Sequence, residues 1–277
     1  MNRKIAIGVV TYKPNMNLTL RLQNAVDFGF SVYIFDNSPE DKLVREFCKK
    51  FNGDVVRYIT CGKNVGLGFG ISSVCAQAYY DSYPALIFFD QDTVFDCSTL
   101  DFIEDFYINN ANMASHYSAI VFNSKNSDDA NIGGKPPLKD VLLAISSGSL
   151  YFLENLNKLH WHNETYFVDC VDYEFCLKSN NNNFKIGECS VTPSFDHKSE
   201  QPDFQYIILG KERLLRKYST HRIFDAMSAS VRLLFSSIRA RNFLFSYAII
   251  RSLAIYINFQ FLVRLMNVFK SKKWIAK

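Results

Sequence analysis

The sequence lacks the closely spaced cysteines from which zinc sites and disulfide frameworks are built. Its seven cysteines are odd in number and widely scattered, and none belongs to a Cys-x-x-Cys pair. Zinc-binding motifs usually contain such pairs, and a disulfide-stapled domain has an even and dense set. We therefore expect reduced thiols in a cytosolic compartment.

Long uninterrupted apolar runs are also missing. The run that begins after Lys4 resembles a signal peptide, but Thr11-Tyr12-Lys13-Pro14 ends it and no small-residue cleavage site follows. We interpret this run as a buried first strand. Near the other end, arginines interrupt the apolar stretches 243–250 and 252–263. Neither stretch reaches the roughly 20 residues that cross a bilayer.

Acidic residues are absent after Asp225. Residues 211–277 hold 14 Lys or Arg and two acids, whereas residues 1–210 carry a net charge of −8. A basic, apolar tail on an acidic body predicts attachment to anionic lipid or nucleic acid. The acidic body argues against nucleic acid. We expect a peripheral protein on the inner face of the cell membrane; the alternative is a helical cap or a homo-oligomer contact.

The first half of the sequence alternates strand-like and helix-like segments. Strands are expected at residues 5–10, 32–35, 55–59 and 85–89, and helices at 16–28, at 40–51 and from the glycine-rich stretch 62–70 to Tyr80. This alternation predicts an α/β fold with a mostly parallel sheet flanked by helices.

The second half shows weaker patterns. We expect strands at 141–145 and 150–152, a mobile loop at 123–138 and helices from about residue 205. The chain is therefore divided into a catalytic domain, residues 1–205, and a helical C-terminal region, residues 206–277.

Asp90 and Asp92 follow directly on the predicted strand 85–89. Ligands of open α/β sheets collect at the carboxyl ends of strands. Carboxylates two residues apart on extended chain point the same way and can hold a hard divalent ion. The alternative is that Asp92-Thr93 only caps the next turn or helix.

Asp36 ends the second predicted strand, where it can accept a hydrogen bond from a base or a ribose; an Asx-turn is the alternative. The glycine-rich stretch 62–70 is not a Walker A loop, because no Gly-Lys-Ser/Thr ends it, and it lacks Gly-x-Gly-x-x-Gly. It can still bring backbone close to a nucleotide or sugar, or simply lead into a helix.

The segment 166–175 combines three acids with aromatic residues at helical spacing. Asp169 and Asp172 would share one face of a helix. A partly desolvated carboxylate can act as the general base for a sugar hydroxyl. The alternative is an acid-rich first helical turn, which the helix dipole favours. His197, one of five histidines, alone indicates a structural or surface group.

Taken in order, these residues resemble family 2 glycosyltransferases of the GT-A fold, especially the bacterial rhamnosyltransferase and galactofuranosyltransferase branches. The resemblance covers roughly residues 4–200. The matching segments are Val10-Thr11-Tyr12-Lys13-Pro14, Asp36-Asn37-Ser38, Asn64-Val65-Gly66-Leu67-Gly68, Phe89-Asp90-Gln91-Asp92-Thr93, Ser147-Gly148, the run from Phe167 to Lys178, and His197.

The resemblance implies an inverting transfer from a nucleotide-diphosphate sugar. Asp90 and Asp92 would hold Mg²⁺ or Mn²⁺ on the diphosphate, with His197 completing the coordination. Asp172 aligns with the catalytic base, and Asp169 is the competing candidate. The residues that would bind the nucleotide sugar are Thr11, Tyr12, Asp36, Asn64, Gly68, Asp90 and Gln91.

The same resemblance gives an expected donor and acceptor. Gln91 between the two acids looks like the rhamnosyltransferase form, which suggests dTDP-rhamnose, with UDP-galactofuranose as the next choice. The acceptor would be a lipid-linked saccharide in bacterial O-antigen or capsule synthesis.

Two other functional classes share parts of this pattern. A nucleotidyltransferase has the same α/β layout, but it would need a basic glycine-rich loop where residues 11–14 stand. A non-catalytic nucleic-acid binder would use the basic tail but not the acidic body.

Overall fold

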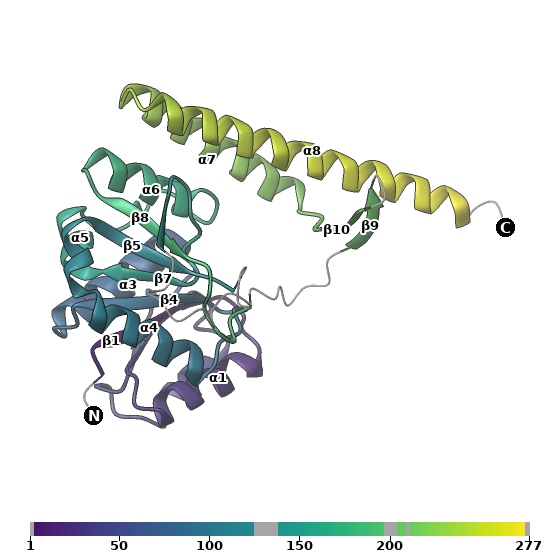
Figure 1. Ribbon diagram of the computed structural model, residues 1–277. Coiled ribbons are helices and arrows are strands. Elements are labelled where there is room, and N and C mark those ends of the chain that lie inside the picture. The colour runs from purple at the N-terminus through teal and green to yellow at the C-terminus, as the bar shows by residue number, and fades with distance from the viewer. Residues whose placement is uncertain (1–2, 125–137, 197–203, 209–210, 275–277) are drawn as a thin grey trace. The chain divides into compact units, whose positions relative to one another are not determined.

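The computed structural model describes residues 3–124, 138–196, 204–208 and 211–274 (Figure 1). The chain forms two compact units, residues 1–198 and 199–277. The boundary predicted after residue 205 instead falls inside strand β9 (Phe204–Ile208) of the second unit.

The first unit is built on an eight-stranded sheet with the order β3-β2-β1-β4-β7-β5-β8-β6. Strands β3, β2, β1 and β4 are mutually parallel, β7 is antiparallel to both its neighbours, and β8 is parallel to β5 but antiparallel to β6. The strands are β1 (Ile5–Thr11), β2 (Val32–Asp36), β3 (Val56–Ile59), β4 (Ala85–Asp90), β5 (Tyr117–Phe122), β6 (Leu138–Val141), β7 (Ser149–Phe152) and β8 (Lys185–Cys189). The predicted α/β fold is confirmed.

Helices flank this sheet. They are α1 (Met16–Asp27), α2 (Lys42–Cys48), α3 (Leu67–Tyr80), α4 (Cys97–Asn109), α5 (Leu153–Lys158) and α6 (Val171–Asn181), with a short 3₁₀ helix η1 (Ala111–Ser115). Asn15, Asp41 and Asp96 cap the amino termini of α1, α2 and α4 through their side chains. Such residues satisfy the free N–H groups of a first turn.

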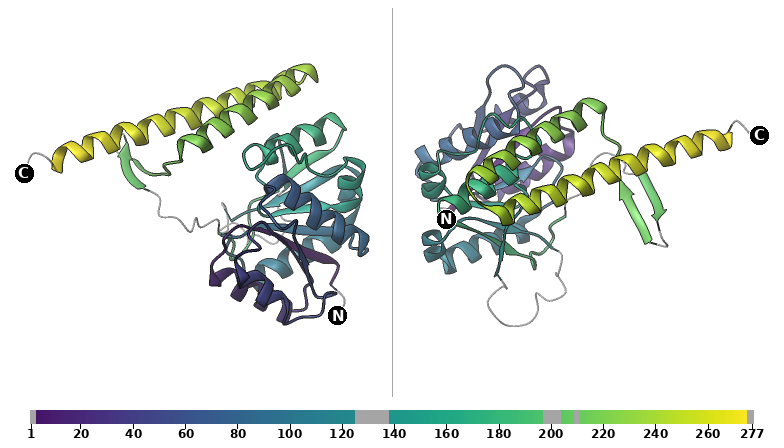
Figure 2. Two further views of the ribbon diagram at one scale, coloured as in Figure 1. Left: turned by 180° about the vertical axis from the view of Figure 1, so that it is seen from behind. Right: turned by 90° about the horizontal axis from the view of Figure 1, so that it is seen from above.

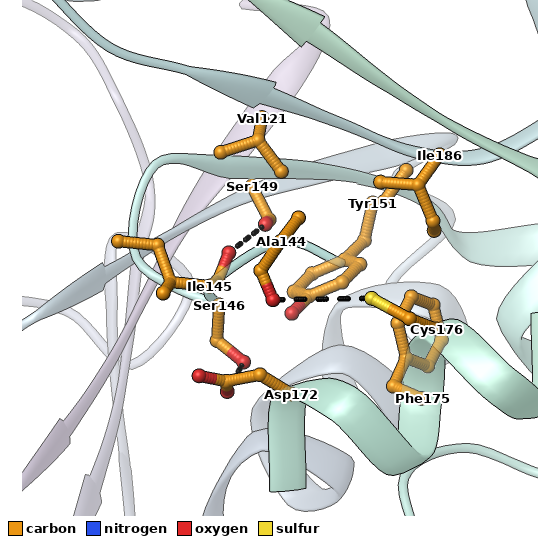
Figure 3. Close-up of a pocket in the computed structure, with 11 residues that line it drawn as sticks. Val121, Ala144, Ile145, Ser146, Ser149, Tyr151, Asp172, Phe175, Cys176 and Ile186 are labelled. Carbon is orange, nitrogen blue, oxygen red and sulfur yellow. Dashed lines mark hydrogen bonds between the residues drawn. The ribbon is translucent and has the colours of Figure 1, made fainter. Parts of the chain in front are cut away.

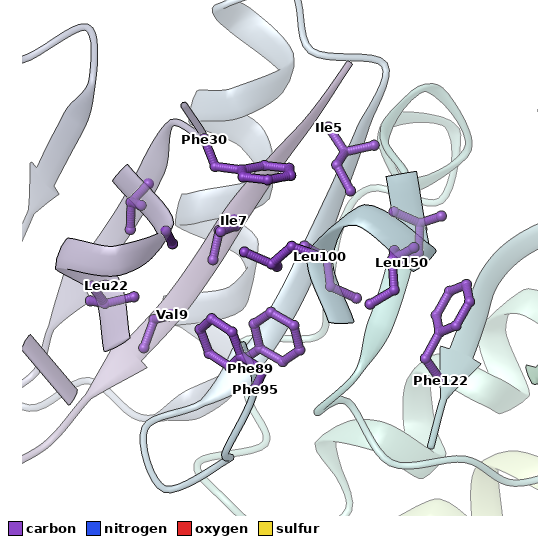
Figure 4. Packing of buried hydrophobic residues seen from close by; sticks show 14 of the residues in the cluster. Ile5, Ile7, Val9, Leu22, Phe30, Phe89, Phe95, Leu100, Phe122 and Leu150 are labelled. Carbon is purple, nitrogen blue, oxygen red and sulfur yellow. The ribbon is translucent and has the colours of Figure 1, made fainter. Parts of the chain in front are cut away.

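Strand β1 is apolar throughout because both of its faces are covered. Ile7 and Val9 point into the core cluster that includes residues of α1, α2 and α4 (Figure 4). On the opposite face, a Cβ at Gly8 would lie 2.7 Å from Leu86 of β4 and 3.1 Å from Val74 of α3. The absence of a side chain there lets α3 pack close to the sheet.

In the second half of the first unit, one strand prediction is wrong and one strand is missing from the prediction. The strand expected at 141–145 ends at Val141, and residues 142–148 form a loop. Strand β5, between β7 and β8, was not predicted. Most of the loop expected at 123–138 lies outside the described residues.

The second unit begins with an antiparallel hairpin, so the prediction of helix from residue 205 is wrong there. Strands β9 (Phe204–Ile208) and β10 (Lys211–Leu215) form this hairpin. Helices α7 (Thr220–Arg239) and α8 (Phe243–Trp274) follow and lie side by side (Figure 2).

Small and large side chains are both buried in the pair of helices α7 and α8. The buried residues of α7 are Ala226, Ala229, Ser230, Leu233 and Ser237. Ser237 Oγ lies 2.7 Å from Ser246 Oγ of α8. Within α8, the segment Phe243–Leu265 is long and apolar enough to cross a membrane, judged by length and composition alone. This segment includes Arg251 and Arg264. The prediction that no stretch here is long enough to cross a bilayer counts such arginines as interruptions.

Candidate active site

Three predicted site residues stand side by side at the carboxyl end of the parallel strands. In the sheet register, Thr11 of β1 pairs with Asp36 of β2, and Val10 pairs with Asp90 of β4. This is the edge at which open α/β sheets bind ligands. The fold thus brings together the residues predicted for the nucleotide and for the metal.

The Asp36 carboxylate is fully buried and accepts hydrogen bonds on both oxygens. Oδ1 accepts from Ser38 N at 2.9 Å and from Thr11 Oγ1 at 3.3 Å. Oδ2 accepts from Tyr58 OH at 2.9 Å. The bond from Ser38 N closes an Asx-turn, which is the structural alternative for this residue. Asp36 therefore shapes the loop after β2, and its contact with a nucleotide stays a prediction.

Gln91 joins the loops that follow β1 and β4. Its side-chain amide accepts from Tyr12 N at 2.8 Å and donates to Tyr12 O at 3.1 Å. Arg21 of α1 donates to the Gln91 carbonyl at 2.6 Å. Both polar atoms of the amide are thus engaged with backbone, whereas the Tyr12 ring is 47% exposed. The predicted sugar contact of Gln91 stays a prediction.

The glycine-rich loop before α3 packs against the segment that precedes α6. A Cβ at Gly68 would lie 2.8 Å from the carbonyl oxygens of Asn163 and Tyr166. Close backbone packing therefore accounts for this glycine. Asn64 is exposed, and its Oδ1 accepts from Gly66 N at 3.0 Å. The roles of Asn64 and Gly68 toward a ligand stay predictions.

Asp90 and Asp92 are half-buried at the end of β4. Burial raises the pKa of Asp90 to about 7, and the charges of Asp172 and Asp92 add to this rise. Crowded carboxylates of this kind fit a divalent cation, which prefers oxygen ligands and offsets their repulsion. Among the residues that the structure describes, no three His, Cys, Asp or Glu side chains form a complete metal cage.

The turn Ser146-Ser147-Gly148 connects the segment 90–93, at the end of β4, to Asp172. Ser147 Oγ accepts from Asp90 N at 3.0 Å and lies 2.6 Å from Thr93 Oγ1. Ser146 Oγ donates a short hydrogen bond to Asp172 Oδ1 (Figure 3). Two adjacent hydroxyl groups therefore reach the end of β4, which carries the predicted metal ligands, and the first turn of α6, which carries the predicted base.

Gly148 allows this turn to form. Its φ is +79°, and a Cβ would lie 2.5 Å from the Phe122 carbonyl oxygen. Gly148 N donates to Phe88 O at 2.8 Å, and Phe122 N donates to Gly148 O at 2.7 Å. A left-handed residue in so tight a place has to be glycine.

Asp172 is the second residue of α6, whereas Asp169 lies before the helix. Cys170, the residue that precedes α6, has a left-handed φ of 63°. The expectation that both acids share one helical face is therefore wrong. Burial raises the pKa of Asp172 to about 6, while the hydrogen bonds from Ser146 lower it. A half-buried base with this pKa is mostly ionised at pH 7.

His197 lies outside the described residues. Asp196, the residue before it, forms a backbone bridge with Val94, two residues beyond Asp92. Val94 N donates to Asp196 O at 2.8 Å, and Asp196 N donates to Val94 O at 3.0 Å. Asp196 therefore lies beside Val94, in the segment that follows Asp92.

Sequence reasoning missed three residues that shape the site: Ser146, Arg21 and Tyr58. Their partners stand 26, 70 and 22 positions away in the chain, so no local spacing signalled them. The only available signal was the Ser146-Ser147-Gly148 turn, of which the resemblance covered Ser147-Gly148.

No protein-family model matches the sequence, and no curated protein matches it. Solved structures do resemble it. A fragment (1–349) of TarS from S. aureus in complex with UDP-GlcNAc has a TM-score of 0.59 and 18% identity, over 93% of this chain and 72% of that one. A TarS structure of which this chain covers 36% has a TM-score of 0.51 at 18% identity, over 69% of this chain.

A more distant structure is GalNAc-T7 with UDP, GalNAc and Mn²⁺. Its TM-score is 0.50 at 9% identity, over 68% of this chain and 42% of that one. At such identities the comparisons establish the fold alone. The chain has the GT-A fold of these glycosyltransferases.

Proposed function

We propose that the chain is an inverting, metal-dependent glycosyltransferase that moves a sugar from a nucleotide-diphosphate sugar onto an acceptor hydroxyl. The observation that carries the proposal is that two adjacent serines link the two acids: Ser146 bonds to Asp172 of α6, and Ser147 bonds to the backbone of Asp90 at the end of β4. This reaction needs a base for the acceptor and charge stabilisation for the leaving diphosphate. Asp172 of α6 could serve as the base, and Asp90 and Asp92 could hold the ion that stabilises the diphosphate.

Asp172 is the proposed general base. An ionised carboxylate held by Ser146 can take the proton of an attacking hydroxyl. A single displacement of this kind inverts the anomeric centre and needs no covalent nucleophile. Asp169, which stands before α6 rather than on it, is the weaker candidate.

Asp90 and Asp92 are the proposed ligands of Mg²⁺ or Mn²⁺, with His197 as a third. When bound, the ion would act as a Lewis acid toward the diphosphate. The backbone bridge between Val94 and Asp196 supports a part for the next residue, His197. The Mn²⁺ in the GalNAc-T7 structure is compatible with this choice.

For the donor, we propose dTDP-rhamnose, on the resemblance around Gln91. Because the Gln91 amide binds the Tyr12 backbone, its influence on the donor would act through loop shape. A UDP-sugar is the second candidate, favoured by the TarS fragment with UDP-GlcNAc. UDP-galactofuranose belongs to this class.

We further propose that residues 206–277 hold the enzyme at the inner face of the cell membrane. The acceptor would there be a lipid-linked saccharide of surface polysaccharide synthesis. Support comes from the net charge of +12 over residues 211–277 and from the apolar segment Phe243–Leu265. Basic residues bind anionic lipid and apolar ones enter the interface.

A panel of nucleotide sugars tests the proposal. With Mn²⁺ present, a donor at 100 times its Kd stabilises the folded state by about 2.7 kcal/mol. The midpoint of thermal unfolding should therefore rise by several degrees with dTDP-rhamnose, and less with UDP-glucose or UDP-N-acetylglucosamine. If UDP-glucose or UDP-N-acetylglucosamine raises the midpoint more than dTDP-rhamnose does, a UDP-sugar becomes the proposed donor. No shift and no transfer with any nucleotide sugar would sink the proposed function.

A further inference from the structure

Near its end, the loop between β6 and β7 carries two serines, Ser146 and Ser147, whose hydroxyls contact different parts of the site. Ser146 is 4% exposed and Ser147 is 1% exposed, so neither hydroxyl is a surface group. Ser146 donates to Asp172, whereas Ser147 contacts the backbone of Asp90 and the side chain of Thr93. A buried hydroxyl that is bonded to a charged group contributes more than an ordinary hydrogen bond.

The turn itself is rigid. Gly148 bonds to backbone on both sides, through Phe88 of β4 and Phe122 of β5. Ser149 Oγ also donates back to Ile145 O at 3.0 Å, which closes the loop on itself. Backbone bonds to the sheet therefore hold the turn, and the bonds to Asp172, Asp90 and Thr93 hold the two hydroxyls in place.

We infer that Ser146 and Ser147 are positioning residues, with Ser146 orienting the base Asp172 and Ser147 orienting the Asp90–Thr93 loop that binds the donor diphosphate. The inference rests on the proposed function and deepens it. The turn 146–148 would then set the distance between the base Asp172 and the loop that binds the leaving diphosphate. Because misplacement by about 1 Å costs as much as 100-fold in rate, this spacing matters for transfer.

The test separates the two serines by their kinetic effects. Ser146→Ala should lower kcat by about 10- to 100-fold, because Asp172 loses the hydrogen bond that orients it. The donor KM should stay nearly unchanged, because this variant keeps the bonds of Ser147. Ser147→Ala should instead raise the donor KM and the Mn²⁺ concentration needed for half-maximal activity. Ser146→Thr keeps the hydroxyl and should recover most of the lost kcat.

Ser118→Ala is the matched control. Ser118 is a fully buried serine of β5 whose hydroxyl donates to Ser179 Oγ at 2.8 Å, so this variant loses the same buried hydroxyl and a hydrogen bond to a neutral partner. It should leave kcat and KM unchanged. If Ser118→Ala and Ser146→Ala lose activity equally, the effect is one of folding and the positioning role is overturned.

A second readout does not require transfer. The hydrogen bonds from Ser146 lower the pKa of Asp172. A carboxyl titration followed by ¹³C NMR should therefore move to higher pH in Ser146→Ala and not in Ser118→Ala. An unmoved titration together with wild-type kcat would overturn the inference. A wild-type protein that transfers no sugar would instead overturn the proposed function, and the titration would still decide whether Ser146 holds Asp172.

Discussion

The two units of this chain are both rich in apolar residues, but the helical unit leaves many more of its large apolar side chains exposed. In residues 1–198, large side chains such as Phe35 and Phe88 are fully buried, and polar groups gather where the strands end. In residues 199–277, Leu233 and Phe245 are also fully buried, but Phe235 and Phe243 are each 69% exposed.

Charge divides the chain in the same way. Asp36, Asp90 and Asp92 stand at the carboxyl ends of β2 and β4, whereas residues 226–277 contain no acid. An acidic cluster suits a metal and an acceptor hydroxyl, and a basic apolar surface suits anionic lipid. Under the proposed function, the first unit supplies the chemistry and the second unit the attachment to the membrane.

The largest effect is expected from removing the metal. Excess EDTA and Asp92→Ala should each abolish transfer, because both remove the charge stabilisation of the leaving diphosphate. Asp105→Ala, which removes an exposed carboxylate of α4, is the control and should keep full activity. Vesicle binding by residues 206–277 should be unchanged in both variants. Transfer that persists in excess chelator would refute the metal role.

The next largest effect concerns the base. Asp172→Asn should lower kcat by about 10²–10⁴-fold while donor binding persists, because only the proton acceptor is lost. Asp169→Asn is the paired variant and should retain most activity, since Asp169 stands before α6. Rates and calorimetric donor titrations of both proteins decide this. Should Asp169→Asn be the dead enzyme, the roles of the two acids are reversed.

The sequence was sufficient for the parts of the fold that depend on local pattern. Strands β1, β2 and β4 have few polar residues before their last ones, Thr11, Asp36 and Asp90, because helices cover both sheet faces. Asp90 and Asp36 were found because each directly follows an apolar run. The resemblance added Asp172.

Features that depend on distant pairing were not predictable. Strand β5 takes its partners from β7 and β8, and β6 is a short edge strand with the polar sequence Leu-Lys-Asp-Val. Ser146 and Ser147 bond to residues 26 to 57 positions away. Only the folded sheet brings such groups together, so no spacing in the sequence reports them.

The smallest effect, on membrane binding, tests the second unit alone. Each basic residue near an anionic surface contributes about 1 kcal/mol, so replacing Arg239, Arg241 and Arg251 by glutamine should weaken vesicle binding on the order of 100-fold at low salt. All three side chains are exposed. Sedimentation with vesicles of mixed anionic and neutral lipid measures this partition.

The matched control replaces exposed lysines of the body, Lys42, Lys50 and Lys158, by glutamine. It changes net charge equally and should leave vesicle binding nearly intact, whereas both triple variants should transfer sugar normally to a water-soluble acceptor. High salt should weaken wild-type binding without abolishing it, because salt screens the arginines but not the apolar side chains. If the wild-type protein does not bind anionic vesicles at low salt, α7 and α8 serve packing or dimerisation. The basic and apolar composition of residues 211–277 would then no longer support a lipid-linked acceptor.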